Sequence, residues 1–348
     1  MKRFQLAIPS WISGGETEME QNDRSVLKVR NLRTGFATPA GTVIAVDDVS
    51  FDLKRNEVLA IIGESGSGKT VTALSLIKLI STPPGRYFGG SIEIEGTDIL
   101  KLDEREMESV RGKTIGMIFQ NPRASLDPSF TIEFQLVETL MRHNRQLDRQ
   151  AALEAAGKAL LEVGFPDTGR VLASYPHQLS GGMCQRVGLA MVLACDPKLL
   201  IADEPTTALD VGVQAKILLL LKKRSRETGL PIIIITHDIG VVRAVATRVL
   251  VMYGGHVQEE GDVDEVLAWP KHPYTQALIR SIPDPDAEQD AMTFIKGEPP
   301  NLLAPPRGCR FAPRCEHAVR ICHEKVPAWR EVGDRWVRCH LAETGVPQ

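Results

Sequence analysis

A glycine-rich loop between an apolar run and a helical pattern is the feature that most limits what this chain can fold into. The loop reads Gly63-Glu64-Ser65-Gly66-Ser67-Gly68-Lys69-Thr70 and matches the pattern G-x-x-x-x-G-K-[ST]. Residues 58–62 before it are all apolar, as in a strand buried on both faces, and apolar residues recur at helical spacing in residues 71–77. Glycines let backbone N–H groups turn inward onto phosphate oxygens, and the N-terminus of the following helix adds partial positive charge. The pattern therefore predicts an α/β nucleotide site, with Lys69 on the terminal phosphates and the Thr70 hydroxyl on Mg²⁺.

A pair of carboxylates follows a second apolar run. Residues 199–202 are apolar and lead into Asp203-Glu204. A carboxylate at the point where a buried parallel strand emerges beside the phosphate loop suits a Mg²⁺ ligand, and we assign that role to Asp203. Two solvated carboxylates at a strand end are common, so the assignment rests on their spacing from the phosphate loop. Glu204 is the next residue along the strand and is expected to point away from Asp203.

Two more strand-like runs lead to single polar side chains. Residues 232–235 precede His237, and residues 115–119 precede Gln120. A lone histidine is more often structural than catalytic, and a single glutamine carries little information. Their roles therefore depend on the series of motifs in which they stand.

The segment Leu179-Ser180-Gly181-Gly182-Met183, called the signature below, predicts a second anion site. Ser180 is a natural N-cap for the segment that follows, and the two glycines leave backbone N–H groups bare there. Standing alone, the pattern would be an ordinary capped helix. Because the phosphate loop already cradles one nucleotide, a single subunit has no obvious use for this second site.

Taken in order, these motifs resemble the nucleotide-binding subunits of ATP-binding-cassette (ABC) transporters, from about Val26 to the C-terminus. The resemblance implies that Glu204 activates or polarises the attacking water, that His237 contacts the terminal phosphate, and that Gln120 senses Mg²⁺ and the water. It also implies that the signature of one subunit closes over ATP held by a second ABC subunit, so that two sites form at a two-fold interface. The residues implied to contact nucleotide or to link the two sites are Gly63, Glu64, Ser65, Gly66, Ser67, Gly68, Lys69, Thr70, Ser180, Gly181, Gly182 and Asp210, with Phe36 as the candidate for stacking on adenine.

Cys184 directly follows the signature, where relatives usually carry a polar or basic residue. We expect closure over ATP to survive this departure. A thiol near the subunit interface suggests the hypothesis that closure is sensitive to oxidation.

Composition and length fit one large domain with an accessory region. The chain has 348 residues, 43% of them hydrophobic, and a net charge of −3, which gives no basic footprint for nucleic acid. No apolar stretch approaches the roughly 20 residues needed to cross a bilayer. A transporter component of this kind would energise a pore built from other chains.

The expected architecture is an ABC-type P-loop ATPase with a RecA-like parallel-sheet core. We expect a flexible leader at residues 1–25, the ATPase domain at residues 26–265 with an N-terminal antiparallel β region, and a helical subdomain at about residues 121–195. The remaining segment, residues 266–348, is expected to be a cysteine-rich metal-binding extension.

The extension contains four of the six cysteines, in the spacing C-x5-C-x6-C-x16-C: Cys309, Cys315, Cys322 and Cys339. Cytosolic thiols are seldom paired, so such a cluster favours metal binding over disulfides. Four thiolates suit tetrahedral zinc or an iron–sulfur cluster, and the spacing alone does not choose between them. His317, His323 and His340 leave a mixed Cys/His zinc site open, and four free structural thiols are the remaining alternative.

Several segments resemble the ATPases of oligopeptide, dipeptide and nickel importers. They are residues 121–128, the His272-Pro273-Tyr274 segment, Pro313-Arg314-Cys315 and Arg338-Cys339-His340. Some members of that group bind a [4Fe–4S] cluster through four such cysteines, so the resemblance implies a cluster here, with zinc as the alternative. It further implies an ATPase that energises import of di- or oligopeptides from the cytoplasmic face of the inner (plasma) membrane. The implied partners are a second ATPase subunit, two transmembrane permease subunits and, indirectly, an extracytoplasmic solute-binding protein.

Three alternatives have a weaker basis in the sequence. Nickel or another small solute could be imported by the same machinery. A soluble ABC ATPase acting on DNA would need a long coiled coil between phosphate loop and signature, and residues 71–179 are too few; a ribosome-associated one usually has two cassettes, and the chain has one phosphate loop. An iron–sulfur regulator would predict cluster-dependent DNA binding, which the acidic balance disfavours.

Overall fold

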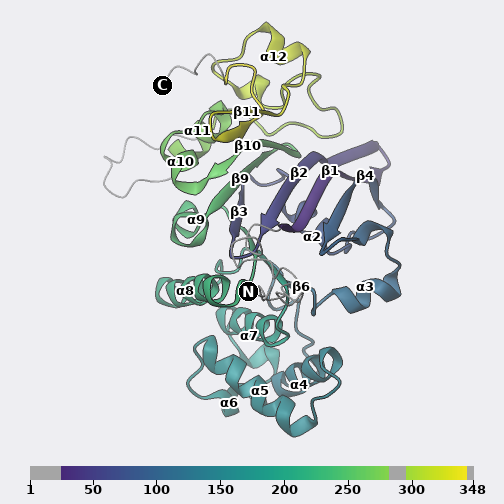
Figure 1. Ribbon diagram of the computed structural model, residues 1–348, viewed down its shortest axis with the longest axis vertical. Coiled ribbons are helices and arrows are strands. Elements are labelled where there is room, and N and C mark those ends of the chain that lie inside the picture. Colours follow the sequence, from purple (N-terminus) through teal and green to yellow (C-terminus); the bar gives the residue numbers. More distant parts are fainter. Residues whose placement is uncertain (1–24, 282–294, 343–348) are drawn as a thin grey trace, which may run out of the picture.

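The computed structural model describes residues 25–281 and 295–342, which form two sheets with helices packed around them (Figure 1). The leader predicted for residues 1–25 lies outside the described residues except for Ser25, the first residue of β1.

A parallel sheet forms the centre of the molecule, in the order β9-β3-β8-β7-β6. These strands are β3 (Val58–Ile62), β6 (Ile115–Ile118), β7 (Leu199–Asp203), β8 (Ile232–Ile235) and β9 (Arg248–Tyr253). Every residue of β3, β7 and β8 is buried, as the apolar runs predicted. A strand of this kind contributes side chains to two hydrophobic cores, because alternate side chains point to opposite faces of the sheet.

The two faces of the parallel sheet pack against different parts of the chain. Ala60 and Ile62 join a core with α7 (Gly181–Ala194), α8 (Val211–Thr228) and α9 (Ile239–Val245). Leu59 and Ile61 join a second core with the antiparallel sheet and α2 (Lys69–Leu76). Because both faces of these strands are packed, the strands cannot slide past one another, and the positions of their carboxyl ends are fixed.

The antiparallel sheet has the strand order β2-β1-β4-β5 and confirms the predicted N-terminal β region. Its strands are β1 (Ser25–Thr38), β2 (Gly41–Lys54), β4 (Gly85–Ile94) and β5 (Thr97–Asp98), followed by the short helices η1 (Ile99–Lys101) and α3 (Glu104–Val110).

A group of helices lies at one end of the long axis of the molecule (Figure 1). It contains α4 (Ile132–His143), α5 (Arg149–Glu162), α6 (Thr168–Ala173), the 3₁₀ turn η2 (Pro176–Gln178) and α7. The side chains of Thr131, Asp148, Asp167 and Ser180 each accept a backbone hydrogen bond at a helix N-terminus, which explains why the four α-helices begin where they do. None of the helices in residues 25–281 and 295–342 combines the length and apolar character needed to span a membrane.

The described residues from His256 onward, called the C-terminal segment below, lie at the opposite end of the molecule (Figure 1) and add three strands to the β9 edge of the parallel sheet, beginning with β10, which pairs antiparallel with β9. The segment includes β10 (His256–Asp262), α10 (Val263–Ala268), α11 (Pro273–Arg280), η4 (Ala312–Arg314), α12 (Arg320–Glu324), β11 (Arg330–Val332) and β12 (Arg335–Val337). Strand β12 pairs with β10, so one sheet contains strands from both sides of residue 265. The division of the chain at that residue into an ATPase domain and an extension stays a prediction.

Ile234 provides a test of the central sheet, because its side chain is 1% exposed in the core shared with α7 and α8. Ile234→Ala should lower the free energy of unfolding by about 2–5 kcal/mol, and Ile234→Val by about 0.5–1.5 kcal/mol, since each leaves a cavity of different size. Chemical denaturation measures both. An alanine variant as stable as the parent would contradict this packing.

Candidate active site

A cavity of about 550 Å³ opens where four parallel strands end at the same edge of the sheet. The phosphate loop follows β3, Gln120 follows β6, Asp203 ends β7, and His237 follows β8. The lining residues are Ala45, Gly63, Glu64, Ser65, Gly66, Ser67, Gly68, Lys69, Thr70, Val71, Gln120, Asp203, Glu204, His237, Leu278 and Ser281. Four of the predicted motifs therefore meet in one place: the phosphate loop, Gln120, the Asp203-Glu204 pair and His237.

Two glycines of the phosphate loop have no room for a side chain. Gly63 and Gly68 have φ angles of 149° and 106°, in the left-handed region. A Cβ on Gly63 would lie 2.1 Å from the carbonyl oxygen of Met252, and one on Gly68 would lie 2.5 Å from that of Ala45. The loop is thus pressed against neighbouring backbone, and α2 begins directly after it at Lys69.

Lys69 lies folded against its own loop. Its Nζ donates to the carbonyl oxygens of Gly63 and Glu64 at 2.8 and 2.9 Å. Burial lowers the pKa of Lys69, while the nearby carboxylates of Glu204 and Asp203 oppose this change. The ammonium group is therefore a partly desolvated cation at the base of the cavity, suited to attract phosphate oxygens.

Asp203 and Thr70 lie together, as expected of residues that share a Mg²⁺ ion. Asp203 is buried, and its carboxylate hydrogen-bonds to the Thr70 side chain. Burial raises the pKa of Asp203, and the Glu204 carboxylate adds to that effect. A carboxylate and a hydroxyl at this position are hard oxygen donors, which Mg²⁺ prefers.

Glu204 is held by two neighbours in a conformation that is uncommon for a residue with a side chain. Its φ angle is 51°, its Oε1 lies 3.0 Å from Nδ1 of His237, and its Oε2 accepts a hydrogen bond of 3.0 Å from Thr207. Burial alone would raise the pKa of Glu204, but hydrogen bonds from His237, Thr207 and Gln120 outweigh it and lower the pKa. Glu204 is therefore a carboxylate at neutral pH and can accept a proton from water.

The signature lies outside this cavity. Ser180 is the N-cap of α7, as predicted, and its Oγ accepts a hydrogen bond of 3.2 Å from the Met183 N–H. A Cβ on Gly182 would lie 2.8 Å from the carbonyl oxygen of Ala208, so the signature packs on the loop that precedes α8. Asp210 caps α8 by accepting from the Val213 N–H at 3.0 Å.

The structure leaves the predicted role of Phe36 untested and argues against the hypothesis made for Cys184. Phe36 lies in β1 opposite Val43 and Gly85 and is not among the described residues that line the cavity. Its stacking role stays a prediction. The Cys184 side chain is 0% exposed, and burial raises the pKa of its thiol. Because oxidation needs an accessible thiolate, the hypothesis of an oxidation-sensitive Cys184 is not supported.

Sequence reasoning missed the contribution of the C-terminal segment to this site. Leu278 of α11 and Ser281 line the cavity, Tyr274 contacts the phosphate loop backbone, and Arg314 pairs with Glu64. The His-Pro-Tyr pattern marked this segment as belonging to a group of importers, but nothing in its spacing placed it beside the nucleotide.

The four cysteines predicted to bind metal gather around one small pocket. Its lining includes Cys309, Cys315, Cys322 and Cys339 together with His272 and His340. Burial raises the pKa of Cys309 to about 12 and that of Cys315 to about 11. Within residues 25–281 and 295–342, no group of three or more His, Cys, Asp or Glu side chains is arranged to hold a metal ion. The structure thus shows the gathering of the thiols, and it does not show a metal-binding extension.

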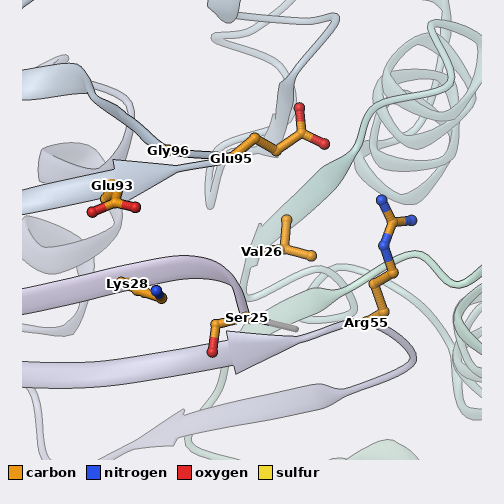
Figure 2. A pocket seen from close by; sticks show the side chains of 7 residues that line it. All are labelled: Ser25, Val26, Lys28, Arg55, Glu93, Glu95 and Gly96. Carbon is orange, nitrogen blue, oxygen red and sulfur yellow. The ribbon is translucent and has the colours of Figure 1, made fainter. Parts of the chain in front are cut away.

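A second hollow, of about 280 Å³, lies at the edge of the antiparallel sheet (Figure 2). Figure 2 shows Arg55 reaching in from the β2–β3 turn and Glu95 from the end of β4, on two sides of Val26. Lys28 and Glu93 complete its charged lining, so acids and bases balance. No motif falls here, and we assign it no ligand.

The fold and the cavity define an ABC-type ATPase, and comparison with known proteins agrees. The family model described as ABC transporter matches residues 46–207, and the one described as oligopeptide/dipeptide transporter, C-terminal region, matches residues 258–322. A dimeric ATP-binding cassette, MJ0796, solved with ADP and Pi, has a TM-score of 0.62 and 28% identity, covering 68% of this chain and 98% of that one.

Curated relatives match over almost the whole length. The oligopeptide transport ATP-binding protein OppD of Bacillus subtilis is 46% identical over 93% of this chain and 90% of its own length. The dipeptide transport ATP-binding protein DppD of the same organism is 46% identical over 87% of this chain and 90% of its own length. The chain belongs to the ABC transporter family, and it is an ATPase.

Glu204→Gln tests the assignment of the general base. The variant keeps the shape of the side chain but cannot take a proton, so ATP hydrolysis should fall by roughly 10²–10⁴-fold while nucleotide binding persists. Phosphate release and binding of a fluorescent ATP analogue measure the two properties. Lys69→Ala is the contrasting variant, because it should weaken binding itself. Turnover near the parental rate in Glu204→Gln would remove Glu204 from the catalytic residues.

Proposed function

We propose that this chain is the ATP-hydrolysing subunit that energises a membrane importer of di- or oligopeptides. The observation that carries the proposal is the C-terminal segment. It matches the oligopeptide/dipeptide transporter model and supplies Leu278 and Ser281 to the nucleotide cavity. The names of the relatives, which refer to oligopeptide and dipeptide transport, support the same class of substrate.

The position of the signature supports a pair of ATPase subunits. Ser180, Gly181 and Gly182 do not line the cavity of their own chain, although Ser180 begins a helix whose N-terminus suits an anion. A second subunit, turned by a two-fold axis, would bring this N-terminus onto the terminal phosphate held by the first. Each site would then be complete only when the two subunits close.

Hydrolysis would follow from the groups already gathered in the cavity. The loop amides and Lys69 bind the phosphates, and Thr70 and Asp203 would hold Mg²⁺, which neutralises charge on the phosphate oxygens. Glu204 accepts a proton from the attacking water. His237, whose Nδ1 lies 3.0 Å from Oε1 of Glu204, lines the same cavity and would contact the terminal phosphate. Loss of the terminal phosphate removes the group that holds the signature, so the pair reopens.

Closing and reopening would move the helical subdomain, which includes α7 and lies at one end of the molecule (Figure 1). We place the contact with two transmembrane permease subunits on this subdomain, at the cytoplasmic face of the membrane. The transported solute, delivered by an extracytoplasmic binding protein, would not touch this chain.

Reconstitution tests the proposed transport function. The chain would be purified together with its membrane subunits and placed in proteoliposomes. ATP would be supplied on the side of the membrane on which this subunit lies, and labelled di- and oligopeptides, or nickel, on the other side. Peptide uptake that needs ATP and is lost with Glu204→Gln is the expected result. Uptake of nickel alone, or tight and salt-sensitive binding of the purified chain to DNA or ribosomes, would contradict the proposal.

We further propose that the cysteine pocket holds a metal centre, a [4Fe–4S] cluster in preference to zinc. The donor set tests the fit, and His272 lies beside it. The His272 side chain is buried, its Nδ1 accepts from the Tyr274 N–H at 2.9 Å, and the Arg338 backbone is the acceptor nearest its other ring nitrogen. Burial lowers the pKa of His272 to about 3, so the ring is neutral and carries its proton on Nε2. Four thiols that line one small pocket are the donor set that both zinc and an iron–sulfur cluster take, and this gathering supports the proposed metal centre.

Metal analysis tests this second proposal. Protein purified without oxygen should be brown and contain iron and acid-labile sulfide, and Cys339→Ser should lose most of both. Cys195→Ser, which changes a cysteine outside the pocket, is the matched control. Colourless protein with stoichiometric zinc would overturn the cluster, and protein without any metal would overturn the metal centre.

A further inference from the structure

Glu64, in the phosphate loop, is gripped by an arginine from the C-terminal segment. The guanidinium of Arg314 bonds to the Glu64 carboxylate through both ends, Nη1 to Oε2 at 2.6 Å and Nη2 to Oε1 at 3.1 Å. The Arg314 side chain is 5% exposed and that of Glu64 23%. A two-point arginine–carboxylate pair sheltered from water is among the stronger polar contacts, unlike an exposed surface pair.

The arginine is itself fixed by the segment that carries it. Its Nε and Nη2 donate to the carbonyl oxygens of Lys296 and Ile295, each at 2.9 Å, and its Nη1 donates to the Tyr253 hydroxyl at 3.2 Å. An arginine guanidinium stays protonated in proteins, and these contacts fix where its charge lies. Arg314 is therefore a charged and rigid group, not a side chain that happens to lie near an acid.

A second contact holds the backbone of the same residue. The Glu64 N–H donates to the Tyr274 hydroxyl at 2.8 Å, and the Tyr274 side chain is fully buried. Its ring packs with those of Tyr253 and Phe311 at centroid distances of 4.5 and 5.4 Å. Both the amide and the carboxylate of Glu64 are thus bound by residues outside the phosphate loop motif.

Glu64 in turn is linked to the lysine that binds phosphate. Its carbonyl oxygen accepts one of the Lys69 hydrogen bonds, at 2.9 Å, and its negative charge acts on the Lys69 ammonium. A Glu64 carboxylate without its arginine would add an uncompensated negative charge to a cavity that must receive polyphosphate. A loop without these contacts would also be free to shift its amides relative to α2.

We propose that Arg314 and Tyr274 are positioning residues of the ATPase reaction. They fix Glu64, and through it the phosphate loop and Lys69, in the conformation that receives ATP, and Arg314 cancels the charge of Glu64. The C-terminal segment thus contributes directly to ATP binding, because it holds the phosphate loop in place. The proposal rests on the ATPase activity and is independent of which solute is transported.

Two other arginines next to pocket cysteines supply a control. Arg310 and Arg338 also adjoin pocket cysteines, and they pair with Asp47 and Asp48 of β2 in place of the phosphate loop. Arg338 is 8% exposed and its Nη2 lies 2.9 Å from Asp48. Arg338→Met therefore removes an ion pair between a buried arginine of the C-terminal segment and a half-exposed acid of the ATPase domain, without touching Glu64.

Steady-state kinetics and equilibrium binding of a fluorescent ATP analogue test the proposal on the full-length chain. Arg314→Met should raise KM and the dissociation constant for ATP by about 10- to 100-fold, which corresponds to about 1.4 to 2.8 kcal/mol of binding free energy. A loss of this size is expected when a charge-assisted hydrogen-bonded pair is broken and one charge is left unpaired. The kcat at saturating ATP should change much less, since Glu204 and His237 are untouched. Tyr274→Phe should raise KM by a smaller factor, because one hydrogen bond is lost and the ring stays.

A double-variant cycle separates positioning from general damage. Adding Glu64→Gln to Arg314→Met should recover much of the affinity, because no unpaired carboxylate then remains in the cavity. Arg314→Lys keeps the charge but not the two-point contact, so it should recover affinity only in part. The thermal unfolding midpoint and the metal content of each variant report whether the fold is intact.

Each remaining outcome contradicts the proposal. Parental KM and affinity in Arg314→Met would show that the contact does not position the loop. An equal rise in KM with Arg338→Met would show that any loosening of the tail suffices. Additive effects of Arg314→Met and Glu64→Gln would show that the two side chains do not act through each other.

Discussion

The convergence of buried parallel strands on one edge of the sheet is the constraint on which the rest of the structure depends. Strands β3, β6, β7 and β8 are held in register by their hydrogen bonds and by cores on both faces, so their carboxyl ends cannot move independently. Each strand delivers one functional element to the cavity: the phosphate loop, Gln120, Asp203-Glu204 and His237. A phosphate site built on loops alone would have to order them at the moment of binding, at a cost in conformational entropy.

The C-terminal segment is part of this framework, because its strands extend the same sheet and its arginines contact the ATPase domain. Strand β12 extends the same sheet through β10, and three arginines beside pocket cysteines reach back to acids of the ATPase domain: Arg310 to Asp47, Arg314 to Glu64 and Arg338 to Asp48. Because each arginine is one residue from a cysteine, the shape of the cysteine pocket and the placement of these ion pairs are linked through single peptide units. A change in the shape of the cysteine pocket would therefore alter the contacts at Asp47, Asp48 and, through Arg314, at the phosphate loop.

Local chemistry explains which parts of this arrangement the sequence could predict. The phosphate loop, the N-cap role of Ser180 and the apolar strands depend on neighbouring residues, and all are found where the sequence placed them. The meeting of Asp203, Glu204 and His237 was predictable only because strands of a parallel sheet end at a common edge. The pairing of Arg314 with Glu64 spans 250 positions and has no local signature, since both residues are common surface types. Phe36 shows the converse limit, because an aromatic near a loop packs as readily as it stacks on a base.

The location of the signature bears on the proposed pair of ATPase subunits. The helix N-terminus that Ser180 caps, followed by two glycines, is of the kind that suits an anion, and it lies outside the described cavity. Gly182 is pressed against Ala208, in the loop whose Asp210 begins α8, so the signature cannot swing alone into the cavity of its own subunit. Cys184 points into the core one turn further on, where its thiol donates to the Pro176 carbonyl. The N-terminus of α7 therefore stays outside the cavity of its own chain, which is the arrangement that the proposed pairing of two ATPase subunits requires.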